Sequence, residues 1–154
     1  MANIAQTINV LQAMLLTKDD QLVKTPTYYV FKMYKVHQNA TLLPLKIKCE
    51  NYTFESTSLP SISASASKDD NGKIHISLAN IDPNEAAQVE INLNGSTQTS
   101  TVSGNIITSE NMNDFNDFGK EEKVNLSSFN NYEITDNMLK VSLPSKSVVT
   151  LEID

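Results

Sequence analysis

The feature that most constrains the fold of this chain is a change of hydrophobic periodicity near Asn39. Beyond that residue, apolar side chains alternate with polar ones in six short stretches. The stretches are Leu43–Ile47, Ile62–Ala66, Ile74–Leu78, Val89–Leu93, Leu139–Leu143 and Val149–Ile153. Alternation places the apolar side chains of each stretch on one face of a β-strand. Short strands without intervening helices predict a mainly β fold, built as an antiparallel β-sandwich of the jelly-roll type.

Turn sequences lie between several of these stretches. Asp70-Asn71-Gly72 precedes the strand that begins near Lys73, and an Asn-Gly pair accepts the positive φ angles of a tight hairpin loop. Asp82-Pro83-Asn84 and Pro144-Ser145-Lys146 consist of residues that favour turns. We therefore predict tight connections at these three places.

The stretch from Ser103 to Asn125 interrupts the alternating pattern. It is rich in asparagine and aspartate and contains Phe115 and Phe118. We predict a long polar loop here, anchored by the two aromatic side chains. Ion binding within residues 104–124 is left open, because oxygen-bearing side chains suit calcium although they lack the fixed alternation of an EF-hand loop.

Residues 25–37 carry the signals of a helix. Thr25 can cap its start, Pro26 suits the first helical position, and Lys32, Lys35 and His37 lie late, where positive charge favours the helix dipole. The apolar side chains surround the axis instead of forming one stripe: Tyr28, Tyr29, Val30, Phe31, Met33, Tyr34 and Val36. A helix that is apolar on most sides is expected to have neighbours on most sides.

Composition excludes several classes of function. The chain of 154 residues has a net charge of -6, and all 12 of its basic residues are lysines. Without guanidinium groups to read guanine or grip phosphate, nucleic acid is not an expected partner. No apolar run approaches the roughly 20 residues of a membrane-spanning helix, so no membrane is expected either.

The single Cys49 excludes an internal disulfide, and we predict a buried or half-buried thiol without a catalytic role.

The two histidines do not suggest a metal site or a nucleophile triad. His75 alternates with Ile74 and Ile76 in a predicted strand, so we expect it to face solvent. His37 lies at the end of the predicted helix. With no further histidine available, we expect neither a histidine-based metal site nor a Ser-His-Asp arrangement.

Four segments of the chain resemble one enzyme family, in the family's order. They are residues 2–13 (Ala-Asn-Ile-Ala-Gln-Thr-Ile-Asn-Val-Leu-Gln-Ala), the helix at 25–37, the hairpin from Ser65 to Pro83, and the closing Leu143–Val149. Together they are similar to glycoside hydrolase family 51, the α-L-arabinofuranosidases, over essentially the whole chain. One departure lies at Asn116-Asp117-Phe118, where a threonine usually follows the asparagine.

The resemblance implies that this chain is the C-terminal part of a longer enzyme. Residues 1–38 would be the tail of a catalytic (β/α)8 barrel, comprising the end of its last strand, a loop and its last helix. Residues 39–154 would be the C-terminal β-sandwich domain. The parent would remove terminal α-L-arabinofuranosyl residues from arabinose-containing polysaccharides and oligosaccharides, with retention and without a cofactor.

The resemblance also implies where the chemistry lies. The family's two catalytic glutamates sit on earlier barrel strands, and the glutamates of this chain match no catalytic motif, so no residue here is assigned as catalytic and the isolated chain is expected to be inactive. Gln6 matches a glutamine of the arabinose pocket at the end of the last barrel strand. Without the other strands we expect it to be an exposed polar residue.

Two functions from different classes remain. The first is a non-catalytic domain that packs against the upstream barrel of the same polypeptide, with a homo-oligomer left open. The second is an independent carbohydrate-binding module. Sugar platforms usually present coplanar aromatic rings, and this chain has no tryptophan, so Tyr52 and Tyr132 are the scattered candidates outside the helix.

Overall fold

The computed structural model describes residues 4, 6–11, 13–93, 101–135 and 137–154. In this part of the chain one short helix accompanies a set of antiparallel strands, so the prediction of a mainly β fold is confirmed. The elements in chain order are β1 (Leu15–Lys18), β2 (Gln21–Lys24), α1 (Pro26–Tyr34), the 3-10 turn η1 (Lys35–His37), β3 (Thr41–Leu43), β4 (Asn51–Phe54), β5 (Thr57–Pro60), β6 (Ile62–Lys68), β7 (Ile74–Asn80), β8 (Ala87–Asn92), β9 (Val102–Ile107), β10 (Ser127–Ser128), β11 (Tyr132–Thr135), β12 (Met138–Leu143) and β13 (Ser147–Ile153).

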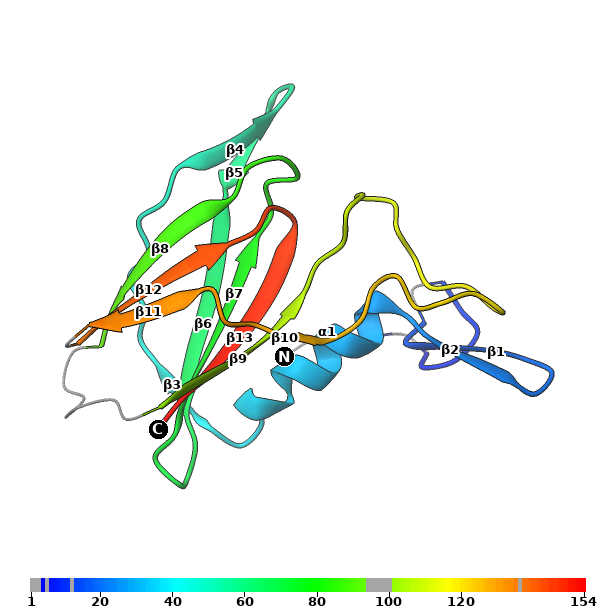
Figure 1. The fold of residues 1–154 in the computed structure, drawn as a ribbon, viewed down its shortest axis with the longest axis horizontal. Helices are drawn as coiled ribbons and strands as arrows, with labels where there is room; N and C mark the ends of the chain where they lie inside the picture. Colours follow the sequence, from blue (N-terminus) through cyan, green and yellow to red (C-terminus); the bar gives the residue numbers. More distant parts are fainter. Residues whose placement is uncertain (1–3, 5, 12, 94–100, 136) are drawn as a thin grey trace.

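Two antiparallel sheets form the sandwich. The larger has the strand order β10-β9-β13-β7-β6-β3, and the smaller has the order β11-β12-β8. Figure 1 shows the smaller sheet lying across the larger one. Leu139, Val141 and Leu143 of β12 meet Val149 and Leu151 of β13 in a core where all five side chains are fully buried. This burial follows from the alternation that defined the strands in the sequence.

The predicted turns are confirmed. In the β6–β7 hairpin, the Asp69 carboxylate accepts hydrogen bonds from the backbone N–H groups of Asn71 (2.9 Å) and Lys73 (3.0 Å), and Gly72 has a φ of 88°. Asp82 binds two backbone N–H groups after β7 in the same way, at 2.8 and 2.9 Å. In both turns the aspartate side chain binds backbone N–H groups a few residues later, so the turn is specified by local residues.

The strand predicted at Leu43–Ile47 is wrong in its position. The structure ends β3 at Leu43, and residues 44–50 are irregular, with Leu45 and Ile47 exposed. Pro44 explains the difference, because its nitrogen has no hydrogen to donate to a strand ladder. The predicted burial of Cys49 is confirmed, because its thiol is half-buried and lies 3.8 Å from the carbonyl oxygen of Ile62.

The hairpin β4–β5 and the short strands β9, β10 and β11 were not predicted from the sequence. Figure 1 shows the β4–β5 hairpin projecting from the body of the sandwich. Its ladder pairs Tyr52 with Leu59 and Phe54 with Thr57. Its polar residues gave no clear alternation, and β10 is only two residues long.

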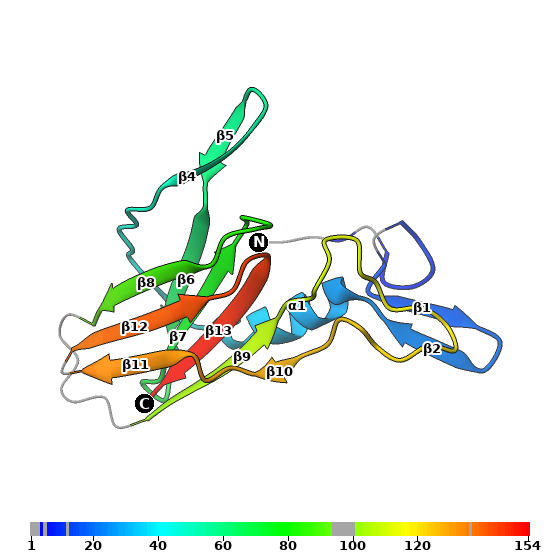
Figure 2. The ribbon, with the colours of Figure 1, turned by 45° about the horizontal axis from the view of Figure 1, so that its top comes forward.

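The helix α1 lies on the outer face of the larger sheet, the face that points away from the smaller sheet. Tyr29 and Met33 are buried there with Ile107 and Val124, and the half-buried Val148 packs against them. Figure 2 shows α1 next to β9 and β13, with the β1–β2 hairpin beyond its N-terminal end. Tyr34, on another side of the helix, is 39% exposed. None of the helices in the described residues has the length and apolar character needed to span a membrane.

Candidate functional site: the N-terminal segment and the loop that holds it

Gln6, to which the family resemblance gives a substrate-binding role in the full-length parent, is exposed. The segment that follows it is fixed against β1. The backbone N–H of Leu15 donates to the carbonyl of Thr7 (3.0 Å), and the N–H of Asn9 donates to the carbonyl of Leu15 (3.1 Å). Asn9 has a φ of 55°, and its side chain binds Thr17 twice, at 2.7 and 2.8 Å. Asparagine tolerates this left-handed conformation better than most residues do.

Thr25 joins this segment to α1. It has the extended backbone of an N-cap and precedes Pro26, as predicted, but its side chain makes no capping hydrogen bond. The hydroxyl instead donates to the carbonyls of Ala13 (2.8 Å) and Met14 (3.1 Å), and the Thr25 N–H donates to Met14 at 3.0 Å. The cap predicted for this threonine is therefore wrong, because its hydroxyl serves the preceding segment.

A loop from the sandwich, residues 108–126, reaches this region. Two of its residues are buried, Val124 and the polar Asn116, which is 4% exposed. The Asn116 Nδ2 donates to the carbonyls of Lys24 (2.8 Å) and Val124 (2.7 Å), and its Oδ1 accepts from the Val124 N–H (2.9 Å). One side chain therefore satisfies three backbone groups, and one of them lies at the end of β2.

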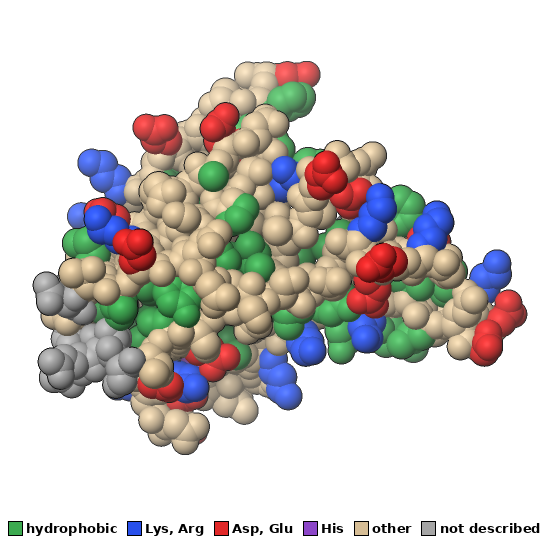
Figure 3. Space-filling view, in the orientation of Figure 1, with side chains coloured by type: hydrophobic (Ala, Val, Ile, Leu, Met, Phe, Trp, Pro, Cys, Tyr) green, Lys and Arg blue, Asp and Glu red, His purple; other side chains and the backbone are tan. Residues whose placement is uncertain are grey.

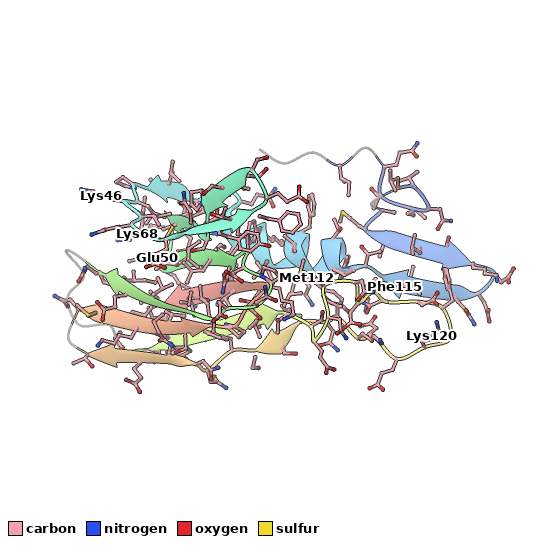
Figure 4. All side chains as sticks on the ribbon, turned by 90° about the horizontal axis from the view of Figure 1, so that it is seen from above. Lys46, Glu50, Lys68, Met112, Phe115 and Lys120 are labelled. Carbon is pink, nitrogen blue, oxygen red and sulfur yellow. The ribbon has the colours of Figure 1, made fainter. Side chains whose placement is uncertain are left out.

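The predicted aromatic anchors of this loop are wrong in part. Phe115 is 63% exposed and Phe118 is half-buried, so the side chain that anchors the loop is the amide of Asn116. Figure 4 labels Met112, Phe115 and Lys120 along the loop. A buried amide between two backbone segments leaves no signature in hydrophobic periodicity, although the Asn116-Asp117-Phe118 motif marked its position.

Ion pairs shape the exposed part of the loop. Lys120 Nζ lies 2.7 Å from Asp117 Oδ2, and Lys123 Nζ lies 3.2 Å from Asp114 Oδ1. The hydrogen bond from Lys120 lowers the pKa of the Asp117 carboxyl. Figure 3 shows lysine and acidic side chains side by side at this end of the molecule. Within the described residues, no three His, Cys, Asp or Glu side chains are grouped so as to bind a metal ion.

Tyr29 links the same loop to α1. Its hydroxyl donates to the Glu122 carboxylate. Burial, and then this hydrogen bond, raise the pKa of Tyr29 to about 12.

A shallow hollow of about 380 Å³ lies between β2 and the loop, lined by residues that include Leu22, Phe118 and Glu122. A larger hollow of about 870 Å³ lies between β8 and residues 44–50.

His75 does not face solvent, so the exposure predicted from its alternation with Ile74 and Ile76 is wrong. It is 4% exposed, and its Nε2 lies 3.1 Å from Asp69 Oδ2. Its ring centroid lies 6.4 Å from that of His37, which comes from η1. His37 binds the Ser67 hydroxyl through Nδ1 (2.7 Å) and the Ser77 hydroxyl through Nε2 (2.6 Å). Alternation put His75 on the outer face correctly, but η1 covers that face.

The candidate sugar-binding tyrosines lie on different elements. Tyr132 of β11 is half-buried against the core, 6.3 Å from Phe129 between ring centroids, and its hydroxyl donates to the carbonyl of Val102. Tyr52 is half-buried in the projecting hairpin. The described residues present these two rings separately and not as a shared platform.

Comparison with known proteins places these features in a family. Residues 1–147 match the family model described as the α-L-arabinofuranosidase C-terminal domain. The chain is 50% identical over 154 residues to the intracellular exo-α-L-arabinofuranosidase of Bacteroides ovatus, covering 99% of this chain and 30% of that protein.

Solved structures agree with this match. The GH51 arabinofuranosidase from Xanthomonas axonopodis pv. citri is 37% identical, with a TM-score of 0.95 over 100% of this chain and 31% of that one. The thermostable GH51 α-L-arabinofuranosidase from Thermotoga petrophila RKU-1 shares the fold at 22% identity, with a TM-score of 0.82 over 97% of this chain and 33% of that one. The chain thus spans about a third of the length of these relatives. Since the family model covers nearly all of it, the chain belongs to the α-L-arabinofuranosidase C-terminal domain family.

Proposed function

We propose that this chain acts as the C-terminal part of a retaining α-L-arabinofuranosidase, in which residues 39–154 support a catalytic barrel formed by upstream residues of the same polypeptide. Residues 1–38 are then the end of that barrel. The share of each relative that the chain covers, 30% and 31% for the two most identical ones described above, supports the existence of an upstream domain.

The observation that carries this proposal is the exposure of large apolar side chains in residues 4–38. Ile8 is 49% exposed, Leu11 91%, Leu22 56% and Tyr34 39%. The strands β12 and β13 of the sandwich, in contrast, bury the side chains that face the core, such as Leu139 and Leu151. Exposed apolar side chains on neighbouring elements mark a surface that another part of a protein covers. A barrel against this end would cover them.

Within the proposed enzyme, the upstream barrel provides the two carboxyl groups of retaining hydrolysis, held about 5–5.5 Å apart across the scissile bond. Gln6 contributes an amide, which can donate to one sugar hydroxyl and accept from another. As a residue at the end of the last barrel strand, Gln6 would lie on the side of the barrel where such active sites form. The substrates are arabinose-containing polysaccharides or oligosaccharides with terminal α-L-arabinofuranosyl groups.

The alternative, an independent carbohydrate-binding module, has less support. Tyr132 uses its ring against Phe129 and its hydroxyl on a backbone carbonyl, so it is not available as a flat sugar platform. Titration of arabinan against the 154-residue chain tests this alternative, and saturable binding that is lost in Tyr52→Ala would favour it.

The test of the proposed function is hydrolysis of a chromogenic α-L-arabinofuranoside. The 154-residue chain is assayed beside the same chain extended upstream through the whole proposed barrel. We expect hydrolysis by the extended protein only, with a raised KM in its Gln6→Ala variant. Hydrolysis by the short chain would contradict the proposal and would require a carboxylate pair within the sandwich.

A further inference from the structure

Asn116 lies in loop 108–126 of the sandwich domain and binds Lys24, in the N-terminal segment that carries Gln6. Its amide binds the carbonyl of Lys24, 92 residues away in the sequence. Lys24 is the last residue of β2, and only Thr25 separates it from α1. Both of its N–H donors and its oxygen are used, and the side chain is buried. A buried amide with all of its partners in place holds one geometry, since any shift leaves a buried donor or acceptor unpaired.

Hydrogen bonds alternating with peptide links lead from this amide to the residue beside Gln6. In β2, Lys24 pairs with Leu15 of β1. The next residue, Thr25, holds the carbonyl of Met14 through its N–H and its hydroxyl, at 3.0 and 3.1 Å. The N–H of Leu15 then donates to the carbonyl of Thr7 at 3.0 Å, and Thr7 follows Gln6 in the chain.

The ion pairs of loop 108–126 and the hydrogen bond of its Glu122 have partners within the loop or in α1. The pairs Asp114–Lys123 and Asp117–Lys120 stay within the loop, and Glu122 binds Tyr29 of α1. Among the hydrogen bonds of the described residues, the one from Asn116 to Lys24 is the one that joins loop 108–126 to residues 4–24. Asp117, where the family usually has threonine, binds Lys120 and the Phe118 N–H, so this departure leaves the Asn116 contacts intact.

We propose that Asn116 is a positioning residue, through which the sandwich fixes the Gln6 segment for substrate binding. The inference rests on the proposed function of Gln6 and adds a role for the sandwich in that function. A residue more than a hundred positions from Gln6 in sequence, in a domain without catalytic groups, then determines how well the active site binds arabinose.

Hydrogen exchange of the 154-residue chain tests the structural half of this inference. We expect Asn116→Ala to raise exchange at the Leu15 and Thr25 amides by about tenfold, because their acceptors lose a fixed position. Amides of β7 and β13 report whether the sandwich remains folded, and they should be unchanged. Asn113→Ala, an exposed residue of the same loop, is the matched control. Unchanged exchange at Leu15 and Thr25 in Asn116→Ala would overturn the inference.

Kinetics of the upstream-extended polypeptide on a chromogenic α-L-arabinofuranoside test the functional half. We expect Asn116→Ala to raise KM by about tenfold, with a smaller change in kcat. Asn116→Asp, which keeps the acceptor but loses both donors, should act in the same direction. A variant that is only destabilised would instead lose kcat at an unchanged KM, because part of the protein would be unfolded.

The double variant Gln6→Ala/Asn116→Ala separates the possible outcomes. If Asn116 acts through Gln6, the double variant has the KM of Gln6→Ala alone. Additive effects, or a wild-type KM in Asn116→Ala beside a raised KM in Gln6→Ala, would overturn this inference and leave the proposed function intact. If the wild-type polypeptide hydrolyses no arabinofuranoside, the proposed function fails, and the inference about substrate binding fails with it.

Discussion

At the scale of single residues, His37 shows how a buried contact acquires a dependence on pH. In a neutral imidazole one ring nitrogen donates and the other accepts, and the hydroxyls of Ser67 and Ser77 suit both roles. A second proton turns both nitrogens into donors, so one buried hydroxyl loses its acceptor. Burial, and then the charge of the nearby His75, lower the pKa of His37.

We predict from this that the chain loses stability as the pH falls from 7.5 to 5. The unfolded chain has an ordinary histidine pKa of about 6.5, whereas the folded chain has a lowered one, so the unfolded state binds more protons in this range. His37→Gln keeps a donor and an acceptor but does not titrate. Its urea midpoint should therefore decline less with pH than that of the wild type.

The other charged groups near His37 define the control for this measurement. Tyr34 packs edge-on against its ring, and His75 faces Asp69 and Glu152, with Lys73 beside Glu152. The hydrogen bond from His75 lowers the pKa of Asp69, so the stability linked to that carboxyl is lost only as the pH falls below about 4. Equal declines in the wild type and His37→Gln between pH 7.5 and 5 would contradict the prediction.

At the scale of elements, α1 is held by the outer face of a sheet whose inner face forms the core. Ser67, Ser77 and Thr150 on that outer face are buried although they are polar. Small side chains let η1 approach the strands closely, and their hydroxyls provide partners for His37. Tyr29 and Met33 supply the apolar part of the same interface.

We predict that Met33→Ala lowers the free energy of unfolding by about 2–5 kcal/mol, the range for truncating a buried methionine. Met33 is 4% exposed and packs in the cluster that joins α1 to β9 and β13. Lys32→Ala, an exposed neighbour in the same helix, should change the free energy by less than about 0.5 kcal/mol. Equal urea denaturation curves for the wild type and Met33→Ala would show that α1 does not contribute to the folded sandwich.

The elements that could be predicted from sequence are those in which local pattern and tertiary packing agree. Strands β6, β7, β8, β12 and β13 coincide with the alternating stretches, and the turn at Asp69–Gly72 is fixed by its own residues. Leu45 is exposed, contrary to prediction, because Pro44 ends β3 before it. His75 is buried, contrary to prediction, because η1 covers the outer face of the larger sheet. The role of Asn116 depends on a contact across 92 residues, which periodicity does not encode.

At the scale of the whole molecule, the exposed apolar side chains of Ile8, Leu11 and Leu22 should make the 154-residue chain self-associate. Exposed apolar surface of this kind is costly in water. We predict that sedimentation velocity shows association that rises with concentration and weakens in Leu22→Lys. Leu42→Lys, which changes a side chain 74% exposed on β3, is the matched control and should associate as the wild type does. A strictly monomeric wild type would contradict this prediction.

The most direct test of the account is hydrogen exchange across residues 4–38, measured in the 154-residue chain and in the polypeptide extended upstream through the proposed barrel. We predict that amides of residues 7–24 and of α1 exchange more slowly in the extended protein, because the barrel covers the exposed side chains of Ile8, Leu11, Leu22 and Tyr34. Amides of β7 and β13 should exchange at the same rate in both proteins. Identical exchange of residues 4–38 in both proteins would contradict the claim that this end of the chain completes an upstream barrel.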